Sequence, residues 1–233
     1  ILCGGMGTRL KEETEYKPKP MVEIGDKPIL WHIMKLYSYY GYNEFILALG
    51  YKGNIIRDYF LNYYYHCNDI SVQLGSKEVL VHGNHEEQKW KITLVDTGQN
   101  SMTGYRVKLA GKYITEDEFM VTYGDAVANI NIGDLVKFHQ SQNTIGTVTG
   151  VFPPSRFGDL KVKDNLVEAF KEKTKIITDD RMINGGFFVF AKSFLDIIPD
   201  DPLTDLEQYP LNKLSQEKQL SVYRHTDFWQ CMD

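Results

Sequence analysis

Hydrophobic residues follow two different patterns along the first half of the chain. Some apolar runs are as short as buried strands, whereas other segments repeat apolar residues every three or four positions, the period of an amphipathic helix. The expected strands are residues 1–3, 44–49 and 119–123, and the expected helices are residues 28–40, 54–65 and 132–142. Strands that alternate with helices are typical of a helix-covered parallel sheet. The pattern therefore predicts an α/β fold with a doubly wound, mostly parallel, Rossmann-like mixed sheet.

Short segments with alternating apolar and polar residues replace this rhythm between residues 70 and 95. They are residues 70–74, 79–81 and 92–95. A period of two residues is typical of half-buried strands. We interpret the three segments as a small antiparallel insertion or hairpin.

The second half of the chain is again rich in strand patterns and contains no clear linker. The segments are residues 144–151, 160–162, 167–170 and 187–191. We expect them to continue the same sheet and to form the other side of a cleft. The prediction is a single domain over residues 1–233, with a first half of about 1–143 and a second half of about 144–233.

Composition and charge argue against several classes of protein. A chain of 233 residues that is 42% hydrophobic can bury the core of one large domain. The net charge of −5 argues against a nucleic-acid partner, because a duplex-binding protein normally carries a basic face. No apolar run approaches the ~20 residues that span a bilayer, so no membrane partner is expected. The three cysteines include no C-x-x-C pair, which favours the reducing cytoplasm.

Both ends of the chain have an apolar character. The chain opens at Ile1 inside an expected strand and stops directly after the largely apolar run 228–232. We therefore expect a short start and a C-terminal tail to be missing.

A glycine-rich segment follows the first expected strand. Residues 4–9 read Gly-Gly-Met-Gly-Thr-Arg, and Lys19 comes later between Pro18 and Pro20. Glycines let backbone N–H groups approach phosphate oxygens, and Arg9 and Lys19 supply positive charge. The two prolines hold Lys19 on a stiff stretch, so its ammonium is aimed at little entropic cost. This segment predicts a polyphosphate site that is neither the dinucleotide fingerprint nor the P-loop; a plain glycine-rich turn is the alternative.

Two aspartates follow separate strand patterns. Asp125 ends the turn Thr-Tyr-Gly-Asp after residues 119–123, and Asp233 follows the run 228–232. Carboxylates from two strand ends, completed by phosphate oxygens and water, suit Mg²⁺. An aspartate after a strand is also common in turns and helix caps. Together with the glycine-rich segment, the pair predicts a magnesium site.

The glycine-rich segment and the Pro-Lys-Pro after it resemble the signature of the sugar-1-phosphate nucleotidyltransferases, and the resemblance covers nearly the whole chain. It implies that Asp125 and Asp233 are the magnesium ligands. It also implies that Arg9 and Lys19 are the catalytic residues, which neutralise the phosphates of a nucleoside triphosphate. The first half of the chain would then bind the nucleotide and the second half the sugar phosphate.

Segments of the second half resemble the acceptor site of this family. Phe-Lys-Glu-Lys is similar to its F-x-E-K segment, in which Glu172 would meet sugar hydroxyls and Lys173 the sugar phosphate. Thr174 stands where the family commonly has proline. Residues 154–158 and 182–187 also match acceptor segments, in which glycines let a sugar ring approach the backbone.

The resemblance implies contacts with both substrates. The residues implied for the nucleotide are Leu2, Gly4, Gly5, Gly7, Thr8, Arg9, Lys19, Thr103, Gly104 and Gly124. Those implied for the sugar phosphate are Tyr123, Gly158, Glu172, Lys173, Asn184 and Gly185.

A narrower resemblance, carried by residues 18–25, 28–34, 94–104 and 228–233, points to the members of the family that use CTP and glucose 1-phosphate. It implies in-line attack by the sugar phosphate on the α-phosphorus, with pyrophosphate leaving and no activated side chain. One alternative is the same chemistry with dTTP, UTP or another sugar 1-phosphate. The other alternative is a catalytically silent regulatory protein that binds nucleotide sugars. Loss of a metal aspartate or of Lys19 from the sequence would indicate such a protein.

Tyrosines are concentrated between residues 37 and 65. Helix packing or a subunit interface explains such a concentration better than base stacking does. We therefore expect a homo-oligomer.

Overall fold

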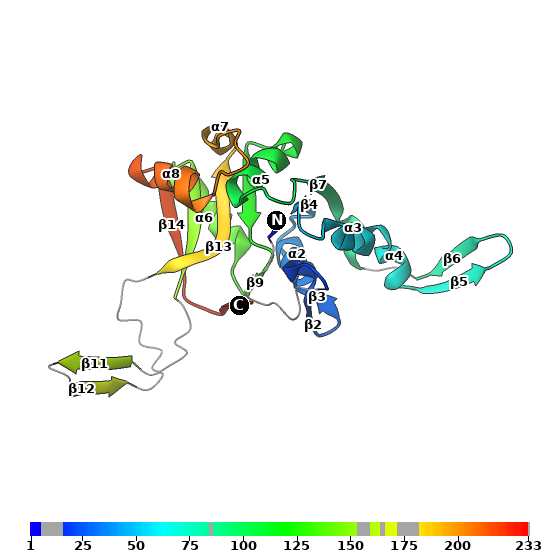
Figure 1. Cartoon of the computed structure of the whole chain (residues 1–233), viewed down its shortest axis with the longest axis horizontal. Helices are drawn as coiled ribbons and strands as arrows, with labels where there is room; N and C mark the ends of the chain where they lie inside the picture. Colours follow the sequence, from blue (N-terminus) through cyan, green and yellow to red (C-terminus); the bar gives the residue numbers. More distant parts are fainter. Residues whose placement is uncertain (6–15, 84–85, 153–158, 164–165, 172–181, 233) are drawn as a thin grey trace.

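A computed structural model describes residues 1–5, 16–83, 86–152, 159–163, 166–171 and 182–232 (Figure 1). The first part contains β1 (Leu2–Cys3), β2 (Glu23–Ile24), β3 (Lys27–Pro28), α2 (Ile29–Tyr39), β4 (Glu44–Leu49), α3 (Gly53–Leu61), α4 (Tyr63–His66), β5 (Asp69–Gln73), β6 (Glu78–His82) and β7 (Lys91–Asp96). The middle contains α5 (Thr103–Ala110), β8 (Glu118–Thr122), β9 (Ala126–Ala128), α6 (Ile132–Gln142) and β10 (Gly146–Val151). The last part contains β11 (Asp159–Lys163), β12 (Leu166–Lys171), β13 (Ile183–Ala191), α7 (Phe194–Ile197), α8 (Asn212–Gln216), β14 (Leu220–His225) and β15 (Trp229–Cys231).

A parallel sheet forms the first half of the fold. Strand β4 lies between β1 and β7 and is parallel to both. A parallel bridge between Leu2 and Tyr123 links this sheet to the end of β8. The carboxyl ends of β1 and β8 therefore lie side by side, at the edge where ligands bind in open α/β sheets.

A four-stranded sheet in the order β14-β10-β13-β8 forms the second half. Strands β10 and β14 are parallel, whereas β13 is antiparallel to both β10 and β8. The predicted α/β class, with a mixed sheet, is confirmed. The antiparallel hairpin β11–β12 is a separate sheet rather than a continuation of this one.

Strand β13 is buried on both faces from Gly185 to Phe190, as expected for a sheet covered by helices on both sides. Phe187 and Val189 belong to one core cluster, together with residues of α2 and α6. Phe188 and Phe190 belong to a second cluster, with residues of α5, α7 and α8. Helices on both faces therefore fix the sheet and leave its carboxyl edge open for a site.

The β5–β6 hairpin confirms the predicted antiparallel insertion, and Figure 1 shows it projecting away from the sheets. Residues 92–95 do not belong to it, so this part of the prediction is wrong. They lie in β7, which pairs in parallel with β4 over residues 44–49. Local alternation of apolar and polar residues is the same for either kind of pairing, so it could not identify the partner strand.

Helix α6 carries a buried histidine, which gives the stability of the fold a dependence on pH. His139 Nδ1 lies 2.7 Å from Thr147 Oγ1. Burial lowers the pKa of His139 below its ordinary value, although the nearby Glu118 acts in the opposite direction. The folded protein therefore favours the neutral ring, whereas the unfolded chain takes up a proton near pH 6.5.

We expect the free energy of unfolding to decrease as the pH falls below about 6.5 and to level off below the folded pKa. His139→Gln should make the stability less dependent on pH in this window. Urea unfolding between pH 7.5 and 5 measures the effect, with His32→Gln as the matched loss of an imidazole. An unchanged pH dependence in His139→Gln would contradict the prediction.

Within the described part of the chain, no helix combines the length and the apolar character that crossing a bilayer requires.

Candidate active site

A cavity of about 480 Å³ opens at the carboxyl ends of β1 and β8. Its lining comes from the end of β1, the turn around Lys19, the loop 99–102, the first turn of α5 and the turn 123–125 after β8. Six of the residues implied for the nucleotide line it: Leu2, Gly4, Gly5, Lys19, Thr103 and Gly124. Tyr123 and Asp125 also line it. The structure thus brings together predicted residues that lie more than a hundred positions apart in the sequence.

The turn that carries Lys19 packs closely against the turn after β8. Pro20 and Met21 are buried, and Met21 N donates to Pro18 O at 2.8 Å. A Cβ on Gly124 would lie 2.8 Å from both Leu2 O and Pro20 Cγ. Glycine is therefore required at position 124 for β1 and the Lys19 turn to approach β8.

This packing places the Lys19 ammonium on the Asp125 carboxylate, with Nζ 2.8 Å from Oδ2. The Lys19 side chain is 12% exposed and that of Asp125 is 33% exposed. The contact is thus partly buried, and salt screens such a pair less than a surface pair. A cation and an anion are held together where the sequence predicts a polyphosphate and a metal ion.

We expect Gly124→Ala to lower the free energy of unfolding by about 1–3 kcal/mol, because the added methyl group meets a backbone oxygen and a proline ring. Chemical denaturation of Gly124→Ala against wild type measures this loss. Gly75→Ala is the control, since a Cβ there meets no described atom within 4 Å. Equal stability of the two variants would show that the turn shifts freely.

Arg106 lies at this site, although no motif of the sequence pointed to it. It lies on α5, and it is only 4% exposed. Its guanidinium donates to the carbonyl oxygens of Gly4, Leu49, Gly98 and Gln99 and to Thr97 Oγ1, at 2.6–3.2 Å. Burial lowers the pKa of Arg106. A buried cation thus joins the ends of β1, β4 and β7 to the loop that forms one wall of the cavity.

The same cation gives Gly4 a structural reason to be glycine. A Cβ at Gly4 would lie 2.2 Å from Arg106 Nη1. Gly5 is exposed, and a Cβ there would meet no described atom within 4 Å. Close packing against Arg106 therefore requires Gly4, whereas the described contacts impose no such requirement on Gly5.

The first turn of α5 is joined to the chain around residue 206. Thr103 Oγ1 accepts from Leu206 N at 2.9 Å and donates to Glu207 Oε2 at 3.3 Å. A Cβ on Gly104 would lie 2.9 Å from Thr204 O. Gly104 is thus buried in a close helix contact rather than on the cavity wall.

Glu207 also accepts a hydrogen bond from the Tyr123 hydroxyl. Burial raises the pKa of Tyr123, so the phenol keeps its proton and donates it. Burial is also the largest influence on Glu207, whose pKa is raised. Asn184 Nδ2 lies 3.4 Å from the same hydroxyl oxygen, so a polar chain runs from Thr103 to Asn184. Glu207 had no sequence signal, because no motif includes it.

The other predicted residues divide into two groups. Gly185 is buried in β13, where a Cβ would lie 2.6 Å from Val151 Cγ1, and it does not line the cavity. Outside the described residues lie Gly7, Thr8, Arg9, Gly158, Glu172, Lys173 and Asp233.

The described residues are compatible with one edge of a metal site. Asp125 offers a partly exposed carboxylate in the cavity, and Mg²⁺ often takes one or two carboxylates together with substrate phosphate oxygens and water. The described chain contains no group of three or more histidine, cysteine, aspartate or glutamate side chains that could hold a metal ion by themselves.

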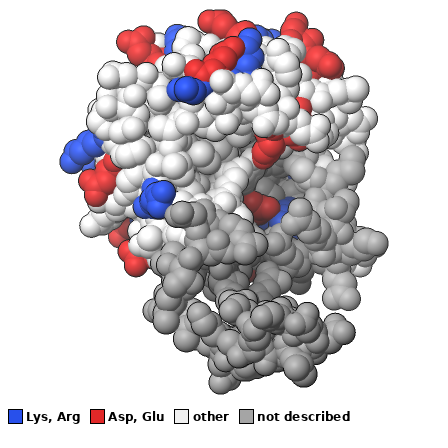
Figure 2. All heavy atoms as spheres, turned by 90° about the vertical axis from the view of Figure 1, so that its left-hand side faces the viewer, with Lys and Arg blue, Asp and Glu red and all other residues white. Residues whose placement is uncertain are grey.

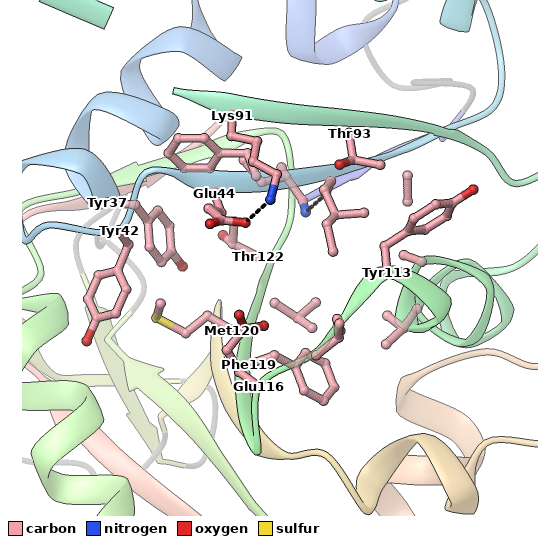
Figure 3. Close-up of a pocket in the computed structure, with 18 of the residues that line it drawn as sticks. Tyr37, Tyr42, Glu44, Lys91, Thr93, Tyr113, Glu116, Phe119, Met120 and Thr122 are labelled. Atoms are coloured by element: carbon pink, nitrogen blue, oxygen red, sulfur yellow. Dashed lines mark hydrogen bonds and ion pairs between the residues drawn. The ribbon is translucent and has the colours of Figure 1, made fainter. Parts of the chain in front are cut away.

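A second cavity, of about 540 Å³, lies between β4 and β8 next to Ile1 (Figure 3). It runs along β4 and β8, and neither Lys19 nor Asp125 lines it. The Glu44–Lys91 ion pair, at 2.8 Å, lies at this cavity, together with Tyr42, Tyr113 and other mainly uncharged side chains (Figure 3). Ligands of such sheets bind at the carboxyl edge, so we assign the site to the first cavity.

The face of the molecule shown in Figure 2 has charged side chains mainly along one rim, with a hollow that contains acidic and basic atoms. The described surface of this face has no broad basic patch. A nucleic-acid-binding face would need one.

Comparisons with known proteins agree on one family. The family model described as "Nucleotidyl transferase" matches residues 1–230. The chain is 49% identical over 234 residues to a glucose-1-phosphate cytidylyltransferase of Salmonella typhimurium, which covers 100% of this chain and 90% of that protein. It is 47% identical over 233 residues to a probable glucose-1-phosphate cytidylyltransferase of Bacillus subtilis, with the same coverage of 100% and 90%.

Solved structures share the fold. HddC from Yersinia pseudotuberculosis aligns with a TM-score of 0.68 at 24% identity, over 99% of this chain and 91% of that chain. The inositol-1-phosphate CTP transferase from T. maritima aligns with a TM-score of 0.65 at 15% identity, over 100% of this chain and 87% of that chain. At these identities the likeness concerns the fold alone.

Proposed function

The chain belongs to the nucleotidyl transferase family, and we propose that it transfers the cytidylyl group of CTP to glucose 1-phosphate, giving CDP-glucose and pyrophosphate. The observation that carries this proposal is the 49% identity, over the whole chain, to a glucose-1-phosphate cytidylyltransferase. The cavity at the carboxyl ends of β1 and β8 is the proposed active site.

The proposed reaction is an in-line attack by a phosphate oxygen of glucose 1-phosphate on the α-phosphorus of CTP. The P–O bond to the attacking oxygen forms as the P–O bond to pyrophosphate breaks. The attacking phosphate is already anionic at neutral pH, so no side chain has to remove a proton. The protein must instead hold two anions together, which is a matter of position and charge neutralisation.

Lys19 is proposed to neutralise the α-phosphate, which its place in the cavity beside Asp125 supports. Arg9, with Gly7 and Thr8, is proposed to hold the β- and γ-phosphates. Thr103 lines the cavity on the side of the loop that Arg106 fixes, which supports a place for the base there. The other nucleotide contacts proposed are with Leu2, Gly4, Gly5 and Gly124.

Asp125 and Asp233 are the proposed ligands of Mg²⁺. When bound, the metal would neutralise charge on the phosphates during transfer. The position of Asp125 at the end of β8, next to Lys19, supports its part of this assignment.

Glucose 1-phosphate is proposed to bind on the side of the second half of the chain. Tyr123 lines the cavity, and its hydrogen bond to Asn184 supports a sugar site near these two residues. Glu172 and Lys173, with Gly158, complete the proposed acceptor site.

We expect Lys173→Ala to raise the Michaelis constant for glucose 1-phosphate far more than that for CTP, because its ammonium is proposed to bind the acceptor phosphate. Loss of one charged hydrogen bond corresponds to about tenfold or more. Steady-state kinetics with each substrate varied in turn measure the split, and Lys192→Ala is the control. A selective loss of CTP binding would place the acceptor site elsewhere.

A panel of substrates tests the proposed function. CTP, UTP, dTTP and GTP are each combined with glucose 1-phosphate, galactose 1-phosphate or mannose 1-phosphate, and pyrophosphate release is measured. We expect CTP with glucose 1-phosphate to give the highest kcat/KM. Preference for another nucleotide would favour the first alternative, and release with none would favour a silent regulatory protein.

The β5–β6 hairpin supports the proposal of a homo-oligomer. Its apolar side chains Leu74 and Leu80 are 87% and 61% exposed. A two-stranded hairpin with an apolar surface is marginally stable alone and offers open strand edges for pairing. We therefore propose that the hairpin packs against a second copy of the chain.

Light scattering after size-exclusion chromatography tests this assembly. Leu74→Asp combined with Leu80→Asp should lower the molecular mass to that of a smaller species. Leu203→Asp changes a side chain that is also 74% exposed but lies outside the hairpin, and it should leave the mass unchanged. The same mass for all three proteins would rule out the hairpin as the interface.

The cysteines support the proposed cytoplasmic location. None of Cys3, Cys67 and Cys231 forms a disulfide. Burial raises the pKa of the Cys3 thiol to about 12, which protects it from oxidation at neutral pH. Cysteines that form no disulfide are typical of a reducing compartment.

A further inference from the structure

We propose that Lys19 serves as an internal counter-ion of Asp125 while the nucleotide is absent, so that a divalent cation binds together with the nucleotide and only weakly before it. The proposal rests on the proposed function, because it takes Asp125 as a metal ligand. It adds to that function a second task for Lys19 and a definite order of binding.

The contact between the two side chains is a built feature rather than a chance surface pair. Nζ and Oδ2 are 2.8 Å apart, and the Lys19 side chain is 12% exposed. Exposed pairs in this protein differ: Lys91 and Glu44 are also 2.8 Å apart, but their side chains are 72% and 70% exposed. Water and salt screen the exposed pair strongly and the Lys19–Asp125 pair less.

The backbone on both sides fixes this pair. Lys19 begins a 3₁₀ turn, closed by the bond from Val22 N to Lys19 O at 3.1 Å, and Pro20 in this turn is buried. The Asp125 carbonyl accepts from Met232 N at 2.8 Å. The main chain on both sides is therefore already ordered, and only side-chain rotamers remain to be fixed when the ammonium meets the carboxylate.

A metal ion that arrives alone must displace the ammonium from Asp125. Two cations would then lie side by side in a partly buried cavity, where their repulsion is stronger than in water. A nucleoside triphosphate changes this balance, because its oxygens supply new anionic partners for Lys19. The carboxylate is then released for the metal, and local charge stays balanced through the exchange.

Binding of Mn²⁺, followed by the water-proton relaxation enhancement that a protein-bound ion produces, tests this order without measuring turnover. In the absence of nucleotide, we expect Lys19→Met to bind Mn²⁺ about tenfold more tightly than wild type. Methionine has a similar length and no charge. Lys17→Met is the matched control. It removes a neighbouring positive charge, and the ion pair of Lys17 with Glu23, at 3.2 Å, is more exposed than the Lys19–Asp125 pair. The Lys17→Met protein should bind Mn²⁺ as tightly as wild type does.

A parallel series with a non-hydrolysable CTP analogue tests separately whether Asp125 is a metal ligand and whether Lys19 is its counter-ion. Asp125→Asn should lose the enhanced Mn²⁺ complex that wild type forms with the analogue. If it does and Lys19→Met binds Mn²⁺ alone no better than wild type, the counter-ion role is wrong and the metal site stands. If Asp125→Asn keeps the complex, the metal assignment in the proposed function is wrong. Lys19→Gln replaces the methionine variant if that variant does not fold, as judged by circular dichroism.

Equal tightening in Lys19→Met and Lys17→Met would also overturn the proposal. It would show that the net charge of the region controls metal binding, rather than the contact between Lys19 and Asp125. Wild-type protein that binds Mn²⁺ equally well with and without the analogue would overturn it as well.

Discussion

Asp125→Asn is expected to reduce turnover about 10²-fold or more, the scale for removing a pre-organised electrostatic partner of a phosphate reaction. Asparagine has nearly the same shape but no negative charge. It leaves Lys19 without the carboxylate that lies 2.8 Å from its Nζ, and it removes the proposed ligand of Mg²⁺. The fold should change little, because the Asp125 side chain is 33% exposed.

Initial rates of pyrophosphate release at saturating CTP, glucose 1-phosphate and Mg²⁺ measure this effect. Asp117→Asn is the control, since Asp117 is an exposed carboxylate directly before the amino end of the same strand. The control should retain wild-type turnover. Turnover of Asp125→Asn close to that of wild type would show that the carboxylate holds no essential metal.

Arg106→Leu is expected to lower the free energy of unfolding by about 3 kcal/mol or more. The leucine would remove the hydrogen bonds of the guanidinium to the carbonyl oxygens of Gly4, Leu49, Gly98 and Gln99 and to Thr97 Oγ1, and a hydrogen bond to a charged group contributes about 1.5–3 kcal/mol. The Gly4 and Leu49 carbonyls keep the backbone donors Tyr51 N and Thr97 N. The loop that carries two of these carbonyls forms a wall of the cavity. We therefore also expect a higher Michaelis constant for CTP.

Chemical denaturation of the variant measures the loss of stability. Lys108 lies on the same helix, and its ammonium donates to one carbonyl oxygen at 2.9 Å. Lys108→Leu should therefore lower the free energy of unfolding by about 1 kcal/mol. Arg106→Lys should fall between wild type and Arg106→Leu, because an ammonium lacks the planar fork that reaches several acceptors. Similar stability of Arg106→Leu and Lys108→Leu would contradict the prediction.

The helices that pack by an apolar stripe were predictable from the sequence. The range 132–142 coincides with α6, and 28–40 nearly coincides with α2. Helix α5 was not predicted. Its residues, Thr-Gly-Tyr-Arg-Val-Lys-Leu-Ala, include a glycine and two cations and show only a weak apolar stripe. It is held instead by the buried Arg106 and by the contact of Gly104 with Thr204.

The sequence also predicted which candidate site residues follow the ends of strands. Gly4 follows β1 and Asp125 follows β8, and in a parallel sheet the ends of such strands meet at one edge. The sequence could not show that Gly4 is glycine because of Arg106, nor that Glu207 joins Thr103 to Tyr123. Those contacts connect residues more than eighty positions apart.

The sequence by itself determined the α/β class, the family and the residue types that a phosphate-transfer site needs, because these depend on local periodicity and on short motifs. Only the tertiary structure decided that residues 92–95 pair in parallel with β4, that β13 runs antiparallel, and that Lys19 meets Asp125. The physical reason is the range of the interactions. Periodicity reports which side of a segment is buried, whereas strand partners, buried cations and ion pairs depend on which distant segments the completed core brings together.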